Sequence, residues 1–209
     1  IDVLKETAHE LGLETETGVD LLPREVPSVV PGRVWKERRY HEQWYQGDTI
    51  NAAIGQGYIL LTPIALARLT ATVASEGTQV WPHVLRKMEG EDETTTRLRT
   101  QPTGTVPIEK RWFALLREGM RGSVQWSSGT GHAADLGDVG VAGKTGSAEV
   151  KKGLPEHAWF TGFAPFEHPE IACTVLIEYG GHGGASAAPV ARQIMRTYFD
   201  LRKQGAWRD

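Results

Sequence analysis

The sequence predicts an α+β fold in which an antiparallel sheet meander is covered by helices. Three strand-like segments follow one another at short spacing between residues 139 and 179. Stretches with the apolar spacing of helices come before and after them. At 209 residues and 40% hydrophobic, the chain is long enough for one substantial core and needs no second domain.

The first half of the chain contains two predicted helices. Residues 1–11 have the spacing of a helix with one apolar face, formed by Val3, Leu4, Ala8 and Leu11. The strongest helix prediction covers residues 62–76. Thr62 can cap this helix, Pro63 suits its first turn and Gly77 can end it. Because the interior of this helix is largely apolar, we expect it to be buried.

The second half adds an extended segment, a surface excursion and two more helices. Residues 79–88 are expected to be extended, and residues 89–105, which are polar and charged, to lie on the surface. Residues 107–122 form an amphipathic pattern with the apolar stripe Trp112, Leu115, Leu116 and Met120. A closing helix over residues 188–202 has Pro189 in its first turn and the apolar stripe Val190, Ile194, Met195, Tyr198 and Leu201. This last helix can cover the sheet.

The predicted sheet consists of three consecutive strands. Residues 139–150, 158–164 and 171–179 are separated by two short turn-forming segments, 151–155 and 167–169. Such short connections join antiparallel neighbours, because a parallel crossover needs a dozen or more residues. The three strands are therefore expected to form a meander.

The first strand contains the most informative motif, Lys144, Thr145, Gly146 and Ser147. The ammonium group supplies positive charge, and the two hydroxyls can donate hydrogen bonds to an anionic oxygen. Gly146 lets a substrate backbone approach closely enough to pair with the strand. These properties suit a peptide that carries a carboxylate. Lys-Thr-Gly is also the third signature of the serine acyltransferases that react with penicillin.

The two other signatures of those enzymes are absent from the sequence. None of its seven serines is followed by lysine three residues on or by asparagine two residues on. The chain also starts at Ile1 inside a helical pattern. We therefore interpret residues 1–209 as an excised or incomplete piece of a larger protein.

Composition excludes several other classes of protein. A net charge of −3 without a basic stripe gives no reason to expect nucleic acid as a partner, and the charged residues 36–39 are expected to form a solvated loop. The single cysteine, Cys173, excludes an internal disulfide and is expected in the core. No apolar run approaches the length of a membrane span, and no signal peptide is visible.

No metal or cofactor is expected. The seven histidines show no metal-binding spacing. His157 could face a cleft mouth, but a surface turn is the preferred interpretation, and His182, flanked by glycines, is expected to be mobile. Residues 55–57, Gly-Gln-Gly, lack the setting of a dinucleotide-binding loop and are interpreted as a tight turn.

Four blocks of sequence carry a resemblance to a known family. Residues 55–67, 143–148, 158–165 and 183–191 occur in the order and rough spacing of a class B penicillin-binding protein. The tryptophan before Phe160 and the small residues before Pro189 look more like the elongation enzymes, penicillin-binding protein 2, than the septal ones. The resemblance implies that residues 1–209 are the C-terminal half of one penicillin-binding/β-lactamase-like transpeptidase domain, whose upstream part carries the nucleophilic serine and its lysine.

The family's activity is then the activity expected here. The resemblance implies a DD-transpeptidase that cross-links D-Ala-D-Ala stem peptides of peptidoglycan through a serine acyl-enzyme and binds β-lactams. It implies a substrate-binding edge from Lys144 to Ala148. In it Lys144 attracts the substrate carboxylate, Thr145 and Ser147 offer hydroxyls, and the backbone N–H of Ser147 forms half of the oxyanion hole. Without the serine, this chain alone is expected to be inactive.

The resemblance also implies a place in the cell. The parent protein is expected at the periplasmic face of the bacterial inner membrane, anchored by an N-terminal helix that this chain lacks. Expected partners are the N-terminal remainder of the same protein and the membrane glycan polymerase of the elongation complex. Alternatives are a penicillin-recognising sensor or a non-catalytic module that binds wall peptides, a structural α+β domain with an accidental Lys-Thr-Gly, and a β-lactamase, which the blocks at Gly55 and Gly183 disfavour.

Overall fold

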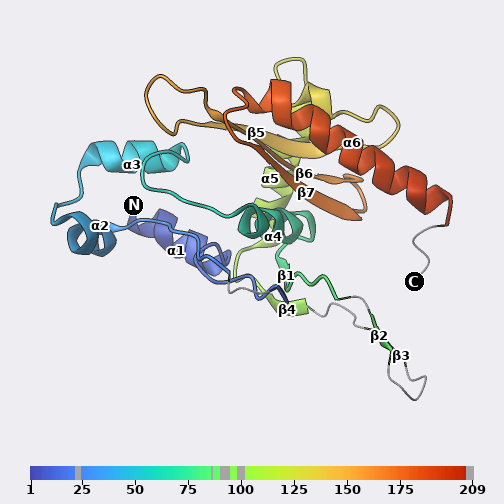
Figure 1. The fold of residues 1–209 in the computed structure, drawn as a ribbon, viewed down its shortest axis with the longest axis horizontal. Helices are drawn as coiled ribbons and strands as arrows, with labels where there is room; N and C mark the ends of the chain where they lie inside the picture. Colours follow the sequence, from blue (N-terminus) through green and yellow to red (C-terminus); the bar gives the residue numbers. More distant parts are fainter. Residues whose placement is uncertain (22–24, 86, 90–94, 98–101, 206–209) are drawn as a thin grey trace. The chain divides into compact units, whose positions relative to one another are not determined.

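The computed structural model describes residues 1–21, 25–85, 87–89, 95–97 and 102–205 (Figure 1). Their elements, in chain order, are α1 (Asp2–Glu10), α2 (Arg33–Tyr40), α3 (Gln46–Ala53), α4 (Pro63–Ala74), β1 (Thr78–Val80), β2 (Lys87–Glu89), β3 (Thr95–Arg97), β4 (Pro102–Thr105), α5 (Lys110–Gln125), the 3₁₀ helix η1 (His132–Ala134), β5 (Ala142–Ala148), β6 (His157–Ala164), β7 (Ile171–Ile177) and α6 (Gly183–Lys203). The mixture of helices and antiparallel strands confirms the predicted α+β class.

The chain divides into two compact units. The first comprises Ile1–Thr72 and Thr78–Pro107, and the second comprises Val73–Gly77 and Ile108–Asp209. That residues 1–209 belong to one functional domain stays a prediction. Among the described residues, no helix combines the length and hydropathy that crossing a bilayer requires.

Helices dominate the first unit. The predicted helix at residues 62–76 is confirmed as α4, and its start is capped as expected, since the Ala65 N–H donates to Thr62 Oγ1 at 3.3 Å. The guanidinium of Arg68 in α4 donates to the carbonyl oxygens of Thr15 and Glu16 at 3.3 and 3.1 Å. These bonds fasten α4 to the segment that follows α1.

Two short antiparallel pairs, β1 with β4 and β2 with β3, also belong to this unit. The extended segment predicted at residues 79–88 is only partly regular, because β1 ends at Val80 and β2 begins at Lys87. The expected surface excursion contains β3 and β4, while residues 90–94 and 98–101 within it lie outside the described part of the chain.

The prediction of a solvated loop at residues 36–39 is wrong. These residues lie in α2, and Lys36 is buried. Its Nζ donates to Asp48 Oδ2 at 2.7 Å and lies 4.7 Å from the centre of the Tyr45 ring. A charged helix therefore buries one lysine because carboxylates from other segments neutralise it, and a run of charged residues does not reveal such partners.

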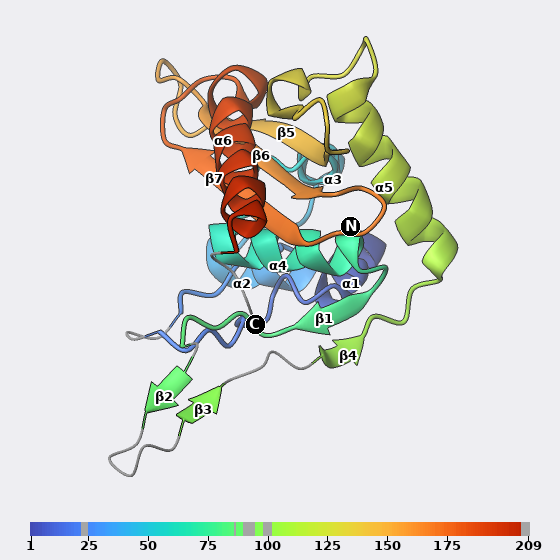
Figure 2. The ribbon, with the colours of Figure 1, turned by 90° about the vertical axis from the view of Figure 1, so that its right-hand side faces the viewer.

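The second unit is built on the sheet β5–β6–β7. All neighbours are antiparallel, with Thr145 opposite Phe160 and Phe160 opposite Val175, so the predicted meander is confirmed. Figure 2 shows α6 running along one face of this sheet. Phe160 and Val175 face α6, whose residues Ala188 and Met195 share their apolar core.

Both helices of this unit bury a face that overlaps the predicted one only in part. In α5 the predicted stripe residues Trp112, Leu115 and Leu116 are half or more exposed, whereas the buried residues are Phe113, Gly122 and Val124. Only Met120 of that stripe packs on a core cluster, beside Phe163. Phe113, Met120 and Val124 share one face because their separations are close to whole helical turns.

The closing helix begins at residue 183 rather than 188, so Pro189 lies inside it and not in its first turn. Its buried face consists of Ala187, Ala188, Ala191, Met195 and Phe199. Of the predicted stripe, Met195 is buried and Tyr198 packs against the core, whereas Val190 and Ile194 are exposed. Small alanines let the helix approach the sheet closely, and a count of large apolar residues overlooks them.

Candidate active site

The predicted substrate-binding residues lie together on β5. In the described part of the sheet the strand order is β5–β6–β7, so β5 is an edge strand and one of its sides does not pair with another strand of that sheet. Lys144 is exposed, and Thr145 to Ala148 are partly exposed. The Lys144 ammonium donates to the carbonyl oxygen of Thr145 at 2.7 Å, which keeps the positive charge beside the strand. An extended peptide can pair with an edge of this kind.

A second hydroxyl stands beside Thr145. The Oγ1 atoms of Thr130 and Thr145 are 2.6 Å apart and share a hydrogen bond. Thr130 lies in the loop after α5, and this loop is tied back to the helix because the Gly131 N–H donates to the carbonyl oxygen of Ser123 at 2.8 Å. The structure therefore adds Thr130 to the predicted site.

The first turn of α6 packs directly against the middle of β5. A Cβ added at Gly183 would collide with the carbonyl oxygens of Trp159 and Gly146 and would lie 2.9 Å from the Gly146 nitrogen. Glycine at position 183 is therefore required by this close approach. The N-terminal end of a helix carries a partial positive charge, which here adds to that of Lys144.

The segment that leads into β5 is also fixed to α6. Arg196 Nη2 lies 2.6 Å from Asp138 Oδ1 and donates to the carbonyl oxygen of Leu136 at 2.5 Å. The hydrogen bond from Arg196 holds the pKa of the Asp138 carboxyl below its ordinary value and raises the pKa of Arg196. These contacts position the start of the strand that carries Lys144.

The two histidines discussed from the sequence lie at the other end of β5. His157 begins β6, opposite Ala148, and its Nδ1 accepts a hydrogen bond from the Tyr179 N–H at 2.9 Å. His182 is the N-cap residue of α6, and its Nδ1 lies 3.5 Å from Glu156 Oε2. Among the described residues, no three His, Cys, Asp or Glu side chains gather as a metal site would require.

Cys173 is buried in β7, and burial raises the pKa of its thiol to about 11. This placement is that of a core residue and is unsuited to a nucleophile.

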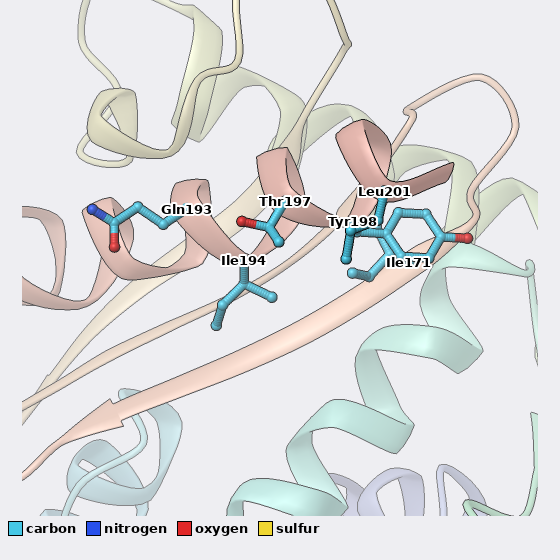
Figure 3. Close-up of a pocket in the computed structure, with 6 residues that line it drawn as sticks. All are labelled: Ile171, Gln193, Ile194, Thr197, Tyr198 and Leu201. Carbon is cyan, nitrogen blue, oxygen red and sulfur yellow. The ribbon is translucent and has the colours of Figure 1, made fainter. Parts of the chain in front are cut away.

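Two surface pockets lie apart from β5. The first, of about 520 Å³, is an apolar groove along the second half of α6, lined by Ile171, Gln193, Ile194, Thr197, Tyr198 and Leu201 (Figure 3). The second belongs to the first unit and is polar, lined by Arg33, Glu37, His41, Glu42, Gln43 and Trp44. Neither contains a residue of the predicted site, and the apolar groove offers no charge to a carboxylate.

Thr130 is the site residue that sequence reasoning missed. The available signal was its setting in Ser127–Gly131, where a hydroxyl stands between two glycines in a loop just before the motif strand. Nothing in that spacing shows that the loop turns back toward Thr145, because the contact depends on tertiary packing.

Comparison with known proteins points to one family. Residues 1–196 match the model of the penicillin binding protein transpeptidase domain. The chain is 35% identical over 218 residues to the peptidoglycan D,D-transpeptidase MrdA of Haemophilus influenzae, covering 97% of this chain and 33% of that protein. The chain thus spans about a third of the length of this relative.

Solved structures give the same picture. The penicillin-binding protein PBP2 of Helicobacter pylori, solved in complex with MreC, superposes with a TM-score of 0.79 at 30% identity, over 99% of this chain and 36% of that one. Penicillin-binding protein A of Mycobacterium tuberculosis, solved as a ceftriaxone acyl-enzyme complex, gives a TM-score of 0.79 at 26% identity, over 94% of this chain and 43% of that one.

Proposed function

Because the chain belongs to the penicillin-binding protein transpeptidase family, we propose that the protein containing it is a peptidoglycan D,D-transpeptidase of the penicillin-binding protein 2 type. The observation that carries the proposal is the Lys144–Ser147 motif on an exposed edge strand inside a family match that spans residues 1–196. The named relatives and the acyl-enzyme complex of a relative support an acyl-transfer reaction that β-lactams intercept.

In the proposed reaction, β5 holds the acyl donor. The donor peptide pairs with the strand edge, and its terminal carboxylate lies by Lys144 and the hydroxyls of Thr145 and Ser147. A serine outside this chain attacks the carbonyl carbon of the D-Ala-D-Ala bond, the terminal D-alanine leaves, and the amine of a second stem peptide then takes the acyl group from the serine.

The oxyanion that forms on this carbonyl needs donors already in place. The backbone N–H of Ser147 supplies one of them and the N–H of the nucleophilic serine the other. Each such donor is typically worth about 3 kcal/mol in the transition state. Gly146 has no side chain and Ala148 carries only a methyl group, which leaves room for the substrate backbone along β5.

The solved relatives also support a cellular location and protein partners for this protein. A relative in this family has been solved in complex with MreC, and another similar solved structure is that of a peptidoglycan synthase complex, in which polymerization and crosslinking are coordinated. We therefore place the protein in the bacterial cell envelope, at the periplasmic face of the inner membrane, with a membrane glycan polymerase as partner. A membrane anchor and the serine motif would both belong to the part of the protein outside residues 1–209.

The test is covalent labelling of the full-length protein by a fluorescent penicillin, followed by a denaturing gel. Labelling is expected in the wild type and is expected to fall at least about tenfold in Lys144→Ala, because the substrate carboxylate loses its cation. The matched control is Lys151→Ala, which removes an exposed lysine from the turn after β5 and is expected to leave labelling unchanged.

Two outcomes would contradict the proposal. Penicillin bound without a covalent label would indicate the non-catalytic binding module instead. Covalent label on residues 1–209 expressed alone would show that the nucleophile lies within this chain, against the assignment made here.

A further inference from the structure

We propose that Thr130 is a positioning residue for this reaction, whose hydroxyl orients the hydroxyl of Thr145 toward the carboxylate of the acyl donor. The inference rests on the proposed function, because it concerns the same carboxylate. It adds a residue outside the Lys-Thr-Gly motif, from a different segment of the chain, and assigns a direction to the hydrogen bond between the two threonines.

The direction follows from the number of protons. A hydroxyl has one proton to donate, whereas an ionised carboxylate can only accept hydrogen bonds. Either Thr130 or Thr145 can be the donor in the 2.6 Å bond between their Oγ1 atoms. If Thr145 donated to Thr130, it would have no proton left for the substrate. In the productive arrangement, the Thr130 hydroxyl therefore donates its hydrogen bond to Thr145, and the Thr145 hydroxyl donates to the carboxylate.

Contacts on two sides hold Thr130 in the position that its hydrogen bond to Thr145 requires. The Gly131 N–H donates to the Ser123 carbonyl oxygen at the end of α5, which fixes the loop on one side. On the other side, a Cβ added at Gly184 in the first turn of α6 would collide with the carbonyl oxygen of Thr130. The partner hydroxyl is equally fixed, because Thr145 lies halfway along β5 and is paired with Phe160 of β6.

A purely structural role accounts poorly for this bond. Thr130 is exposed and Thr145 partly exposed, so water can replace either partner in the unfolded or mutated protein. Hydrogen bonds of exposed neutral groups contribute little to net stability. The loop after α5, β5 and the first turn of α6 nevertheless hold the two threonines in place. Binding of a ligand by the Thr145 hydroxyl explains this arrangement better than stability does.

The experiment measures the second-order rate constant for acylation of the full-length protein by benzylpenicillin and by its methyl ester, which lacks the carboxylate charge. The variants are Thr130→Val, which keeps the shape and removes the hydroxyl, Thr130→Ser, which restores it, Thr145→Val and the double valine variant. We expect Thr130→Val to slow acylation by the acid about tenfold, because the Thr145 hydroxyl loses the donor that orients it toward the carboxylate, and to leave acylation by the ester within about twofold of wild type.

Two further results are expected if Thr130 acts through Thr145. Thr130→Ser keeps a rate near that of the wild type, and adding Thr130→Val to Thr145→Val causes no further loss. Equal slowing of acid and ester, a full additional tenfold loss in the double variant, or an unchanged rate in Thr130→Val would each overturn the inference. If Thr130→Val does not fold, the acid-to-ester rate ratio of Thr130→Ala decides, because that ratio does not depend on the amount of folded protein.

Failure of the proposed function would look different. Wild-type protein that is not acylated, or is acylated equally fast by the acid and the ester, would overturn the assignment of the carboxylate site itself and the inference with it. Wild type that prefers the acid, combined with an unaffected Thr130→Val variant, would overturn only the role of Thr130.

Discussion

Lys36 Nζ lies 2.7 Å from Asp48 Oδ2, although the Lys36 side chain is only 2% exposed. The lysine comes from α2 and the aspartate from the first turn of α3, where Asp48 also accepts a hydrogen bond from the Tyr45 N–H at 2.8 Å. The hydrogen bond from Lys36, followed by that from Tyr45, lowers the pKa of Asp48, and the bond to Asp48 raises the pKa of Lys36. One carboxylate thus serves both the start of α3 and the packing of α2 against it.

The first prediction is that Asp48→Asn destabilises the protein at neutral pH and that this loss disappears in acid. Because the folded-state pKa of Asp48 lies below its ordinary value of 3.8, the carboxylate's contribution is fully present above about pH 4. It is lost as the pH falls through the lower folded-state pKa. Urea unfolding of wild type and variant at a series of pH values measures the difference.

Asp2→Asn is the control for this prediction. Asp2 also pairs with a cation, Arg33 at 3.1 Å, but both side chains are mostly exposed, and such pairs contribute little. A difference between wild type and Asp48→Asn that stays constant down to about pH 2 would show that the carboxylate charge is not what stabilises the folded state.

The second prediction compares two neighbouring aromatic residues of α5. Phe113 is 1% exposed and Trp112 is 50% exposed. Phe113→Ala is expected to lower the free energy of unfolding by about 3–5 kcal/mol, because it leaves a cavity in the core. Trp112→Ala is expected to change it by about 0.5 kcal/mol or less. Chemical denaturation measures both. Equal losses would mean that the stripe expected from the sequence is buried after all.

The same helix shows where sequence reasoning about the fold stops. Apolar periodicity, together with turn and capping residues, located α4, α5, the sheet strands and α6, because all of these signals are local in the sequence. It did not decide which face of α5 is buried, since Trp112 and Phe113 both begin plausible apolar stripes. The helices α2 and α3 were missed because their charged and small residues do not form an apolar stripe.

The candidate site likewise contains residues that the sequence predicts and residues that it does not. Lys144 to Ala148 could be named in advance because the whole motif lies on one strand. Thr130 could not, and neither could the packing role of Gly183, since each depends on a contact between segments that are distant in sequence. Residue type and spacing predict the strand edge, whereas the residues that support it depend on packing.

The third prediction concerns the single cysteine. With a pKa of about 11, the Cys173 thiol is about 0.1% ionised near pH 8, compared with roughly a quarter for a thiol with an ordinary pKa of about 8.5. Alkylation by iodoacetamide should therefore be at least about 100-fold slower in native protein than in urea. Mass spectrometry of the Cys173 peptide follows the reaction. Similar rates in the two states would place the thiol at the surface.

The fourth prediction is that Gly183→Ala damages both stability and acylation. Since the added Cβ would collide with backbone atoms of Trp159 and Gly146, the first turn of α6 must move away from β5. Overpacking of this kind typically costs about 1–3 kcal/mol. We expect penicillin acylation of the full-length protein to fall more than the stability loss explains, measured at a temperature where the variant is folded.

Gly119→Ala separates this collision from the general effect of replacing a helical glycine. Gly119 lies inside α5, and a Cβ there would meet nothing within 4 Å. Alanine at position 119 should therefore stabilise the helix by up to about 1 kcal/mol and leave acylation unchanged. If Gly183→Ala behaved like Gly119→Ala, the first turn of α6 would not press on the middle of β5. The packing of this turn could then not be what holds Gly146 in place in β5. Nor could it hold Thr130, which it contacts through Gly184, beside Thr145.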